Sequence, residues 1–200
     1  VLRYRAESHL RFTHGPQRRT PQMQPYVQLP PELNPRTLAL ARQMQANPRL
    51  AAGGAQAFVD DALRRLRSGG YRYTLEPGLY GAHTADEFWF DRKEGFCEHI
   101  ASAFVVLMRA LDVPARIITG YQGGQQNPID GYWTVHQSDA HAWAEVWIAG
   151  RGWVRVDPTS AVAPGRVGQL QRLQAPRGML GTAMDAVVSP TLVQHLRTVW

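Results

Sequence analysis

The sequence predicts an α+β domain in which helices come first and an antiparallel β-sheet follows. Before residue 112, apolar residues recur at helical spacing, and proline or asparagine marks the helix ends. After residue 115 they alternate with period two, as in strands, and Gly150, Arg151 and Gly152 indicate a hairpin. With 44% hydrophobic and 19% charged residues, the 200-residue chain can bury the core of one large domain, or of one domain plus a fragment of another.

Residues 1–34 differ from the rest of the chain. Residues 2–6 alternate like a strand, and the prolines at 16, 21, 25, 30, 31 and 35 exclude a long helix. We interpret residues 1–34 as the tail of a preceding β-rich module followed by a proline-rich connector. Because the first residue is Val rather than Met, we expect the chain to come from a longer protein, in which a membrane anchor could lie.

Three helices are expected next. The first covers residues 35–46, with Asn34 as cap and Pro35 at the first position, and the second covers 54–68. Residues 71–96 show no clean period, so we expect a loop with one short strand at 71–74. The third helix begins near Cys97 and ends before Pro114.

Strands are expected in the following part, at residues 115–121, 132–135, 141–148 and 153–157. Residues 35–165 would then form the core domain. Beyond Pro164 the chain is rich in Gln and Arg, with helices expected near 167–174 and 191–200. We therefore describe 166–200 as a C-terminal helical extension.

The net charge of +6 comes from 22 basic residues, of which only Lys93 is a lysine. The arginines are spread along the chain rather than gathered into a patch, so we do not expect a nucleic-acid partner. An anionic membrane surface or cell-wall polymer would account for the charge equally well. The longest apolar run is short, at residues 100–108, whereas a bilayer span needs about 20 residues.

Cys97 is the single cysteine, so no disulfide can form within the chain. At a helix start, unpaired amides and the helix dipole both favour a thiolate, which is the nucleophilic form of cysteine. The alternative is a packing role, because Cys97 shares a helical stripe with Ala101 and Phe104. Gly95, two residues earlier, would permit a tight turn into the helix.

His141 and Asp157 lie on the two arms of the expected hairpin. If the turn is centred at position 149, the two residues are cross-strand neighbours, about 4.5–5.5 Å apart at Cβ. The carboxylate could then fix the imidazole tautomer, while the other ring nitrogen faces a thiol. The alternatives are a structural strand histidine and an aspartate that forms the turn before Pro158.

Other candidates are weaker. On a helix, His99 points away from Cys97, and His136 is expected in a solvated loop. His83 with Asp86 and Glu87 could suggest a metal, but without a close His pair we expect no metal and no cofactor. The tryptophans at 133, 143, 147 and 153 are expected in the core or on sheet faces, and Trp89 could help to stabilise an oxyanion.

Four segments, in this order and spacing, resemble the transglutaminase-like superfamily. They read GFCEHIASA (95–103), VPARIITGY (113–121), DAHAWAEVW (139–147) and GWVRVDPT (152–159). The resemblance covers about residues 30–165. It implies a papain-like fold and a catalytic triad of Cys97, His141 and Asp157. Further features at 29–31 and 121–124 resemble a subgroup of bacterial inner-membrane enzymes whose soluble domain lies on the periplasmic side.

The expected activity is therefore transfer of a glutamine acyl group to an amine through a thioester on Cys97. The expected partners are a protein or peptide substrate with glutamine and an amine acceptor. A peptidase or deamidase that uses water is the first alternative, and a non-catalytic peptide or cell-wall binding module is the second. We expect the domain on the periplasmic face of the inner membrane, attached through segments outside this chain.

Overall fold

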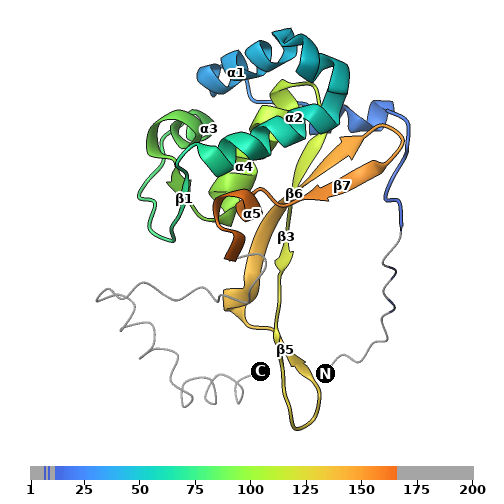
Figure 1. Ribbon diagram of the computed structural model, residues 1–200, viewed down its shortest axis with the longest axis vertical. Coiled ribbons are helices and arrows are strands. Elements are labelled where there is room, and N and C mark those ends of the chain that lie inside the picture. Colours follow the sequence, from blue (N-terminus) through green and yellow to red (C-terminus); the bar gives the residue numbers. More distant parts are fainter. Residues whose placement is uncertain (1–6, 8, 10–11, 166–200) are drawn as a thin grey trace, which may run out of the picture.

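The computed structural model describes residues 7, 9 and 12–165 (Figure 1). The strand expected at 2–6 and the helices expected at 167–174 and 191–200 lie outside the described residues. The long helices are α1 (Pro35–Ala46), α2 (Pro48–Ser68) and α4 (Cys97–Ala110). The shorter helical segments are η1 (Pro21–Tyr26), α3 (Thr84–Asp86), η2 (Glu87–Arg92), η3 (Gln137–Asp139) and α5 (Thr159–Val162). None of the helices within the described residues is long and apolar enough to cross a bilayer.

The main sheet has three antiparallel strands in the order β3-β6-β7, so the predicted α+β class is confirmed. These strands are β3 (Ala115–Tyr121), β6 (Ala140–Ile148) and β7 (Gly152–Val156). Two further pairs are small: β1 (Arg72–Tyr73) runs parallel to β2 (Glu94–Gly95), and β4 (Gln125–Gln126) pairs with β5 (Trp133–Thr134). The β4–β5 hairpin projects beyond the end of the main sheet (Figure 1).

Helix α4 lies at the centre of the domain, because it packs on β3 and β6 on one side and on α1 and α3 on the other. Its apolar residues follow the i, i+4, i+7, i+8 spacing of a buried helix face. Ile100, Phe104, Leu107 and Met108 are all fully buried. Because Cys97 begins this same helix, packing of the core fixes the position of the cysteine.

Helices α1 and α3 cap one another. The Asp86 carboxylate accepts hydrogen bonds from the backbone N–H groups of Arg36 (2.9 Å) and Thr37 (2.7 Å) at the start of α1. In return, the Asn34 side-chain oxygen accepts from the N–H of Ala85 (2.9 Å) in α3. Asn34 is the N-cap residue of α1 with Pro35 after it, as expected, but its side chain makes no capping hydrogen bond in α1 and caps α3 instead.

Two expectations need correction. Helix α2 starts at Pro48 rather than 54, and the backbone of Gly54 (φ 59°, ψ −148°) breaks it into two pieces. The segment between 71 and 96, expected as a loop, contains α3 and the π-helical turn η2. Phe88 and Trp89 in that turn are buried against the core. Three consecutive aromatic residues at 88–90 give no helical period, which is why the sequence pattern does not reveal this turn.

The segment before η1 covers the outer edge of β7. The backbone N–H of Trp153 donates to the His14 carbonyl (2.7 Å), and that of Gly150 donates to the Gln17 carbonyl (2.9 Å). The Trp147 indole N–H donates to the Pro16 carbonyl (2.7 Å). Residues 14–17 thus add main-chain hydrogen bonds to the sheet, although the proposed domain boundary at 34 remains a prediction.

Candidate active site

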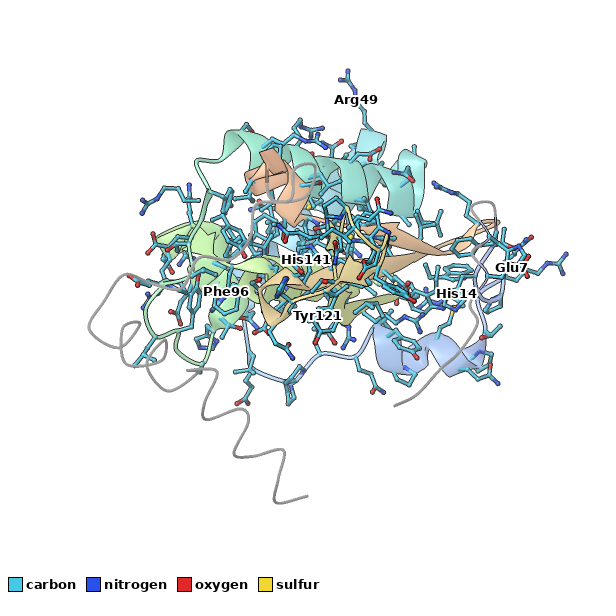
Figure 2. The ribbon with its side chains drawn as sticks, turned by 90° about the horizontal axis from the view of Figure 1, so that it is seen from below. Glu7, His14, Arg49, Phe96, Tyr121 and His141 are labelled. Atoms are coloured by element: carbon cyan, nitrogen blue, oxygen red, sulfur yellow. The ribbon has the colours of Figure 1, made fainter. Side chains whose placement is uncertain are left out.

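Cys97 is the first residue of α4 and is buried, with 6% of its surface exposed. It lies in a pocket of about 310 Å³ between the start of α4 and the ends of β3 and β6. Phe96 and His141, both labelled in Figure 2, belong to this pocket. The full lining is Leu75, Phe96, Cys97, Glu98, Thr119, Gly120, Ala140, His141 and Ala142.

Gly95 is needed here for space rather than for a turn. A Cβ atom on this residue would lie 2.6 Å from the Cβ of His99, one turn into α4. Gly95 has no positive φ angle, so the expected tight turn into the helix is not the reason for a glycine at this position. A side chain at 95 would push His99, and with it the first turn of α4, out of place.

His141 lies on β6, directly opposite Gly120 of β3, and is 8% exposed. Its Nε2 lies 2.8 Å from Oδ2 of Asp157, the residue that follows β7. The second ring nitrogen, Nδ1, is then left for the hydrogen bond that His141 shares with the side chain of Cys97. The structure thus brings together the three side chains that the sequence predicts to meet.

The strand register differs from the expected one by two residues. Ala144 pairs with Val156 and Ile148 with Gly152, so the β6–β7 turn is centred at residue 150 instead of 149. In this register His141 and Asp157 are diagonal rather than direct cross-strand neighbours. A shift by two keeps both side chains on the same face, because side chains alternate with period two. Diagonal neighbours are still within reach of an imidazole and a carboxylate.

The pKa of Cys97 lies below the ordinary value of a cysteine. Burial acts to raise this pKa, but the hydrogen bond with the His141 side chain acts to lower it. The backbone amides of Ala142 and Glu98 and the charge of His141 lower it further. The site therefore favours a thiolate on Cys97.

The pKa of His141 moves in the opposite direction. Burial acts to lower it, while the hydrogen bonds and charges of Asp157 and Cys97 raise it, to about 9. A raised imidazole pKa beside a lowered thiol pKa favours the proton on His141 and the negative charge on Cys97. The Asp157 carboxylate, 2.8 Å from Nε2, favours the protonated form of His141.

Two neighbours on the same sheet face complete the site: Trp143, one of the tryptophans expected in the core or on a sheet face, and Arg155, which the sequence analysis did not name. The Trp143 ring stacks against the His141 ring, with centroids 6.2 Å apart, and the Arg155 guanidinium lies 4.2 Å from the Trp143 ring centroid. Arg155 also reaches Oδ2 of Asp157 (3.4 Å). Period two along each strand places 143 with 141 and 155 with 157, so this signal was present in the sequence.

The remaining candidates have structural contacts. Trp89 is buried, and its indole N–H donates to the Ala103 carbonyl (3.0 Å), so the expectation that it could stabilise an oxyanion is wrong. Nδ1 of His83 accepts from the backbone N–H of Asn34 (3.0 Å). His136 is exposed, as is Trp133, which was expected in the core or on a sheet face. Across residues 7, 9 and 12–165, no three His, Cys, Asp or Glu side chains are grouped to hold a metal ion.

A helix that presents a cysteine at its N-terminus to a histidine on an antiparallel sheet is the arrangement of papain-like enzymes. The family model described as the transglutaminase-like superfamily matches residues 39–158. The chain belongs to this superfamily.

Named relatives agree with this assignment. A protein-glutamine gamma-glutamyltransferase of Pseudomonas aeruginosa is 45% identical over 167 residues, which are 82% of this chain and 24% of that protein. The uncharacterized protein YebA of Bacillus subtilis is 31% identical over 141 residues, 67% of this chain and 19% of that protein. The chain thus spans a quarter or less of these two relatives.

The fold matches a solved structure. The crystal structure of the periplasmic domain of TgpA from Pseudomonas aeruginosa has a TM-score of 0.72 and 43% identity, covering 78% of this chain and 54% of that domain. A second crystal structure of the same domain, bound to ethylmercury, has a TM-score of 0.71 and 44% identity and covers 76% of this chain and 54% of that domain. The expected transglutaminase-like fold is therefore confirmed.

Proposed function

We propose that this domain transfers a glutamine acyl group to an amine, with Cys97 as nucleophile, His141 as acid and base, and Asp157 as the residue that orients His141. The observation that carries this proposal is the Cys97–His141 pair, whose pKa values are shifted toward thiolate and imidazolium. Such a pair is poised for attack on a carbonyl carbon without a separate deprotonation step.

In the first half of the reaction, the Cys97 thiolate attacks the carbonyl carbon of a glutamine carboxamide. The negative charge that develops on the oxygen is stabilised by the backbone N–H of Cys97 at the start of α4. His141 gives its proton to the nitrogen, and ammonia leaves. A thioester on Cys97 and a neutral His141 remain.

In the second half, an amine nitrogen attacks the thioester carbon. Neutral His141 takes a proton from the attacking nitrogen, and the C–S bond breaks to restore the thiolate–imidazolium pair. Asp157 holds Nε2 of His141, so that Nδ1 faces the sulfur in both steps. If water attacks in place of the amine, the product is a carboxylate and the same site acts as a deamidase or a peptidase.

The family and the named relatives support this activity and its setting. The transferase of P. aeruginosa is named for protein glutamine, so we propose protein or peptide substrates with an accessible glutamine. Because the solved relative is a periplasmic domain, we also propose a location on the periplasmic face of the inner membrane. Hydrophobic spans flanking this region in the full gene are expected, and their absence would contradict that location.

The direct test is a product analysis with a glutamine peptide, with and without an added primary amine, read by mass spectrometry. We expect an amine-peptide adduct in the presence of amine. Formation of glutamate alone at every amine concentration would replace the transferase proposal with the deamidase alternative, and cleavage of the peptide bond would replace it with the peptidase alternative. Cys97→Ser is the matched control for both products.

A thiol reagent separates an enzyme from a binding module. Organic mercury compounds and haloacetamides react with thiolates, and Cys97 is the single cysteine of the chain. We expect Cys97 to react much faster than free cysteine near neutral pH. A rate equal to that of free cysteine would favour a binding module without activity.

A further inference from the structure

Arg155 turns toward the triad, although its direct cross-strand neighbour is a carboxylate. Arg155 of β7 is opposite Glu145 of β6, and Arg116 of β3 is opposite Glu145 on the other side. The Glu145 carboxylate accepts two hydrogen bonds from Arg116, at 2.9 Å and 2.6 Å. The Arg116 guanidinium also lies over the Trp153 ring, 4.4 Å from its centroid. Because Arg116 engages Glu145, the contacts of Arg155 lie elsewhere, at the active site.

Two oxygen atoms anchor the Arg155 guanidinium beside the active site. Its Nη2 lies 3.3 Å from the side-chain oxygen of Gln122 and 3.4 Å from Oδ2 of Asp157. Oδ2 is also the atom that contacts His141. The other carboxylate oxygen, Oδ1, is buried and has no hydrogen-bond partner among the described residues. The guanidinium is thus tied to the same oxygen of Asp157 that orients His141.

The Trp143 ring contacts both Arg155 and His141. The guanidinium carbon of Arg155 lies 4.2 Å from the Trp143 ring centroid, which is a cation–π contact. The Trp143 and His141 rings are inclined by 24°, with centroids 6.2 Å apart, which is the geometry of an offset stack. Arg155 and His141 therefore meet twice, once through Oδ2 of Asp157 and once through the Trp143 ring.

Gly120 provides the space in which the Trp143 ring lies. Gly120 is directly opposite His141 in the β3–β6 pairing and is diagonal to Trp143. A Cβ atom on Gly120 would lie 2.9 Å from Cη2 of the Trp143 ring. The φ angle of Gly120 is not positive, so the backbone does not require a glycine here. The glycine instead allows the ring to lie across β3, beside the imidazole.

Trp143 is only half-buried, so packing in the core does not by itself hold its ring against His141. The guanidinium of Arg155 supplies an outer contact for the ring. Arg155 is itself half exposed and its two hydrogen bonds are long, so its contribution to folding should be small. Its contacts converge on the imidazole, where a small misalignment has a large effect on rate.

We propose that Arg155 is a positioning residue, which holds the Trp143 ring against His141 and thereby keeps the imidazole aligned with Cys97. This inference rests on the proposed acyl transfer and adds two residues to its machinery. Asp157 restrains His141 at Nε2, whereas Trp143 restrains the plane of the ring. Restraints at two places on the imidazole define its orientation better than one hydrogen bond does.

The first test measures kcat and KM for a glutamine peptide in Arg155→Met, which keeps an aliphatic side chain but removes the guanidinium. We expect kcat to fall on the order of tenfold while KM stays within about twofold of the parent, because His141 acts in the chemical steps. Trp143→Leu should lose at least as much. Arg151→Met is the matched control, since Arg151 lies in the turn of the same hairpin and contacts Gln56 (2.9 Å).

A double-mutant cycle tests whether Arg155 acts through Trp143. If it does, Arg155→Met should cost little once Trp143 is Leu, so the double variant should keep the kcat of Trp143→Leu within about twofold. Two independent roles would instead make the losses multiply, and that outcome would overturn the proposal. Melting temperatures of the single and double variants check that the fold is kept.

Proton NMR of the His141 ring gives a signature that does not depend on turnover. The ring current of Trp143 displaces the resonances of the nearby imidazole protons, and Trp143→Leu removes this displacement. At low pH, where His141 is protonated in every variant, Arg155→Met should remove a large part of the same displacement and Arg151→Met none of it. Resonances that keep the parent positions in Arg155→Met would overturn the proposal, because Trp143 would then hold its place without the guanidinium.

The kinetic outcomes separate this inference from the proposed function. A fall in kcat of equal size in Arg151→Met, or a raised KM with unchanged kcat in Arg155→Met, would overturn the positioning role and leave acyl transfer in place. A parent protein that converts no glutamine peptide, with or without amine, would overturn acyl transfer itself. The NMR displacement would still report whether Arg155 holds Trp143 against His141.

Discussion

Two imidazoles flank the first turn of α4, and their properties are opposite. His141 on the sheet side has its pKa raised to about 9, and His99 on the outer side has its pKa lowered. Burial acts to lower the pKa of both rings. The difference comes from Asp157, whose carboxylate lies 2.8 Å from His141, and from the Cys97 thiolate.

His99 has no such partner. Its ring packs edge-on against Phe96 (4.4 Å between centroids) and lies tilted against Tyr80 (4.7 Å). Its buried Nδ1 has no hydrogen-bond partner within the described residues. The comparison teaches that proximity in sequence to Cys97 does not suit a histidine to the proposed acid–base role. A charged partner on a second element does, because it keeps the imidazolium stable inside the protein.

Removal of the sulfur should have the largest effect. Cys97→Ala should abolish both amide formation and hydrolysis, because no thioester can form. The fold should be kept, since the change takes one atom from the wall of a pocket. Product analysis and melting temperature are the measurements. Any turnover retained by this variant would contradict the proposal that Cys97 is the nucleophile.

Loss of the Asp157 carboxylate should have the second largest effect on activity. Asp157→Asn leaves a hydrogen-bonding group near His141 but favours the wrong tautomer, a change that costs about 10⁴ in a serine triad. We expect a loss of kcat on the order of 10²–10⁴, because a thiolate at a helix start depends less on its base. His141→Ala should lose at least as much.

The alternative for Asp157 is a turn residue before Pro158. Asparagine fills turn positions as well as aspartate does, so Asp157→Asn would then be nearly silent. Activity within about threefold of the parent, with unchanged melting, would remove Asp157 from the triad.

The pH dependence of turnover and of alkylation should distinguish the role of His141 from that of Cys97. Turnover requires protonated His141, so it should fall as pH rises through about 9, and this limb should move to lower pH in Asp157→Asn. Alkylation requires only the thiolate, so its rate should rise at a pH below the ordinary cysteine pKa and then stay level. If the rates of turnover and of alkylation both fall at the same alkaline pH, His141 and Cys97 do not have these separate roles.

Substitution of the outer histidine should have the smallest effect. His99→Phe keeps a ring between Phe96 and Tyr80 and removes the unpartnered Nδ1. We expect a fall in kcat of at most about threefold and no shift of the alkaline limb, because the ring carries no charge near neutral pH. A shifted limb would mean that His99 takes part in the proton transfer.

Local signals allowed the sequence to predict some parts of the fold well. Helix α1 has the bounds that Asn34-Pro35 and Asn47-Pro48 indicate, and β3 has the bounds expected from its alternation. The contact between His141 and Asp157 was also predicted, although the turn between them was placed one residue too early. The contact was predicted correctly despite this error, because side chains alternate with period two and the shift left both residues on the same face of the sheet.

Features that depend on distant contacts were missed. Trp89 donates to a carbonyl of α4, and Asp86 caps a helix that starts about fifty residues before it. Nothing in the residues next to Trp89 or Asp86 indicates these partners. Long-range packing, rather than propensity, decides these positions.

The cover that residues 14–17 give to β7 has a consequence for how the domain behaves in solution. A chain shortened to begin at residue 35 would keep Cys97, His141 and Asp157, but it would expose the N–H of Trp153 to solvent at a bare strand edge. Bare edges pair with the edges of other molecules. We therefore expect that a chain begun at residue 35 associates with itself more readily than one that keeps residues 14–17.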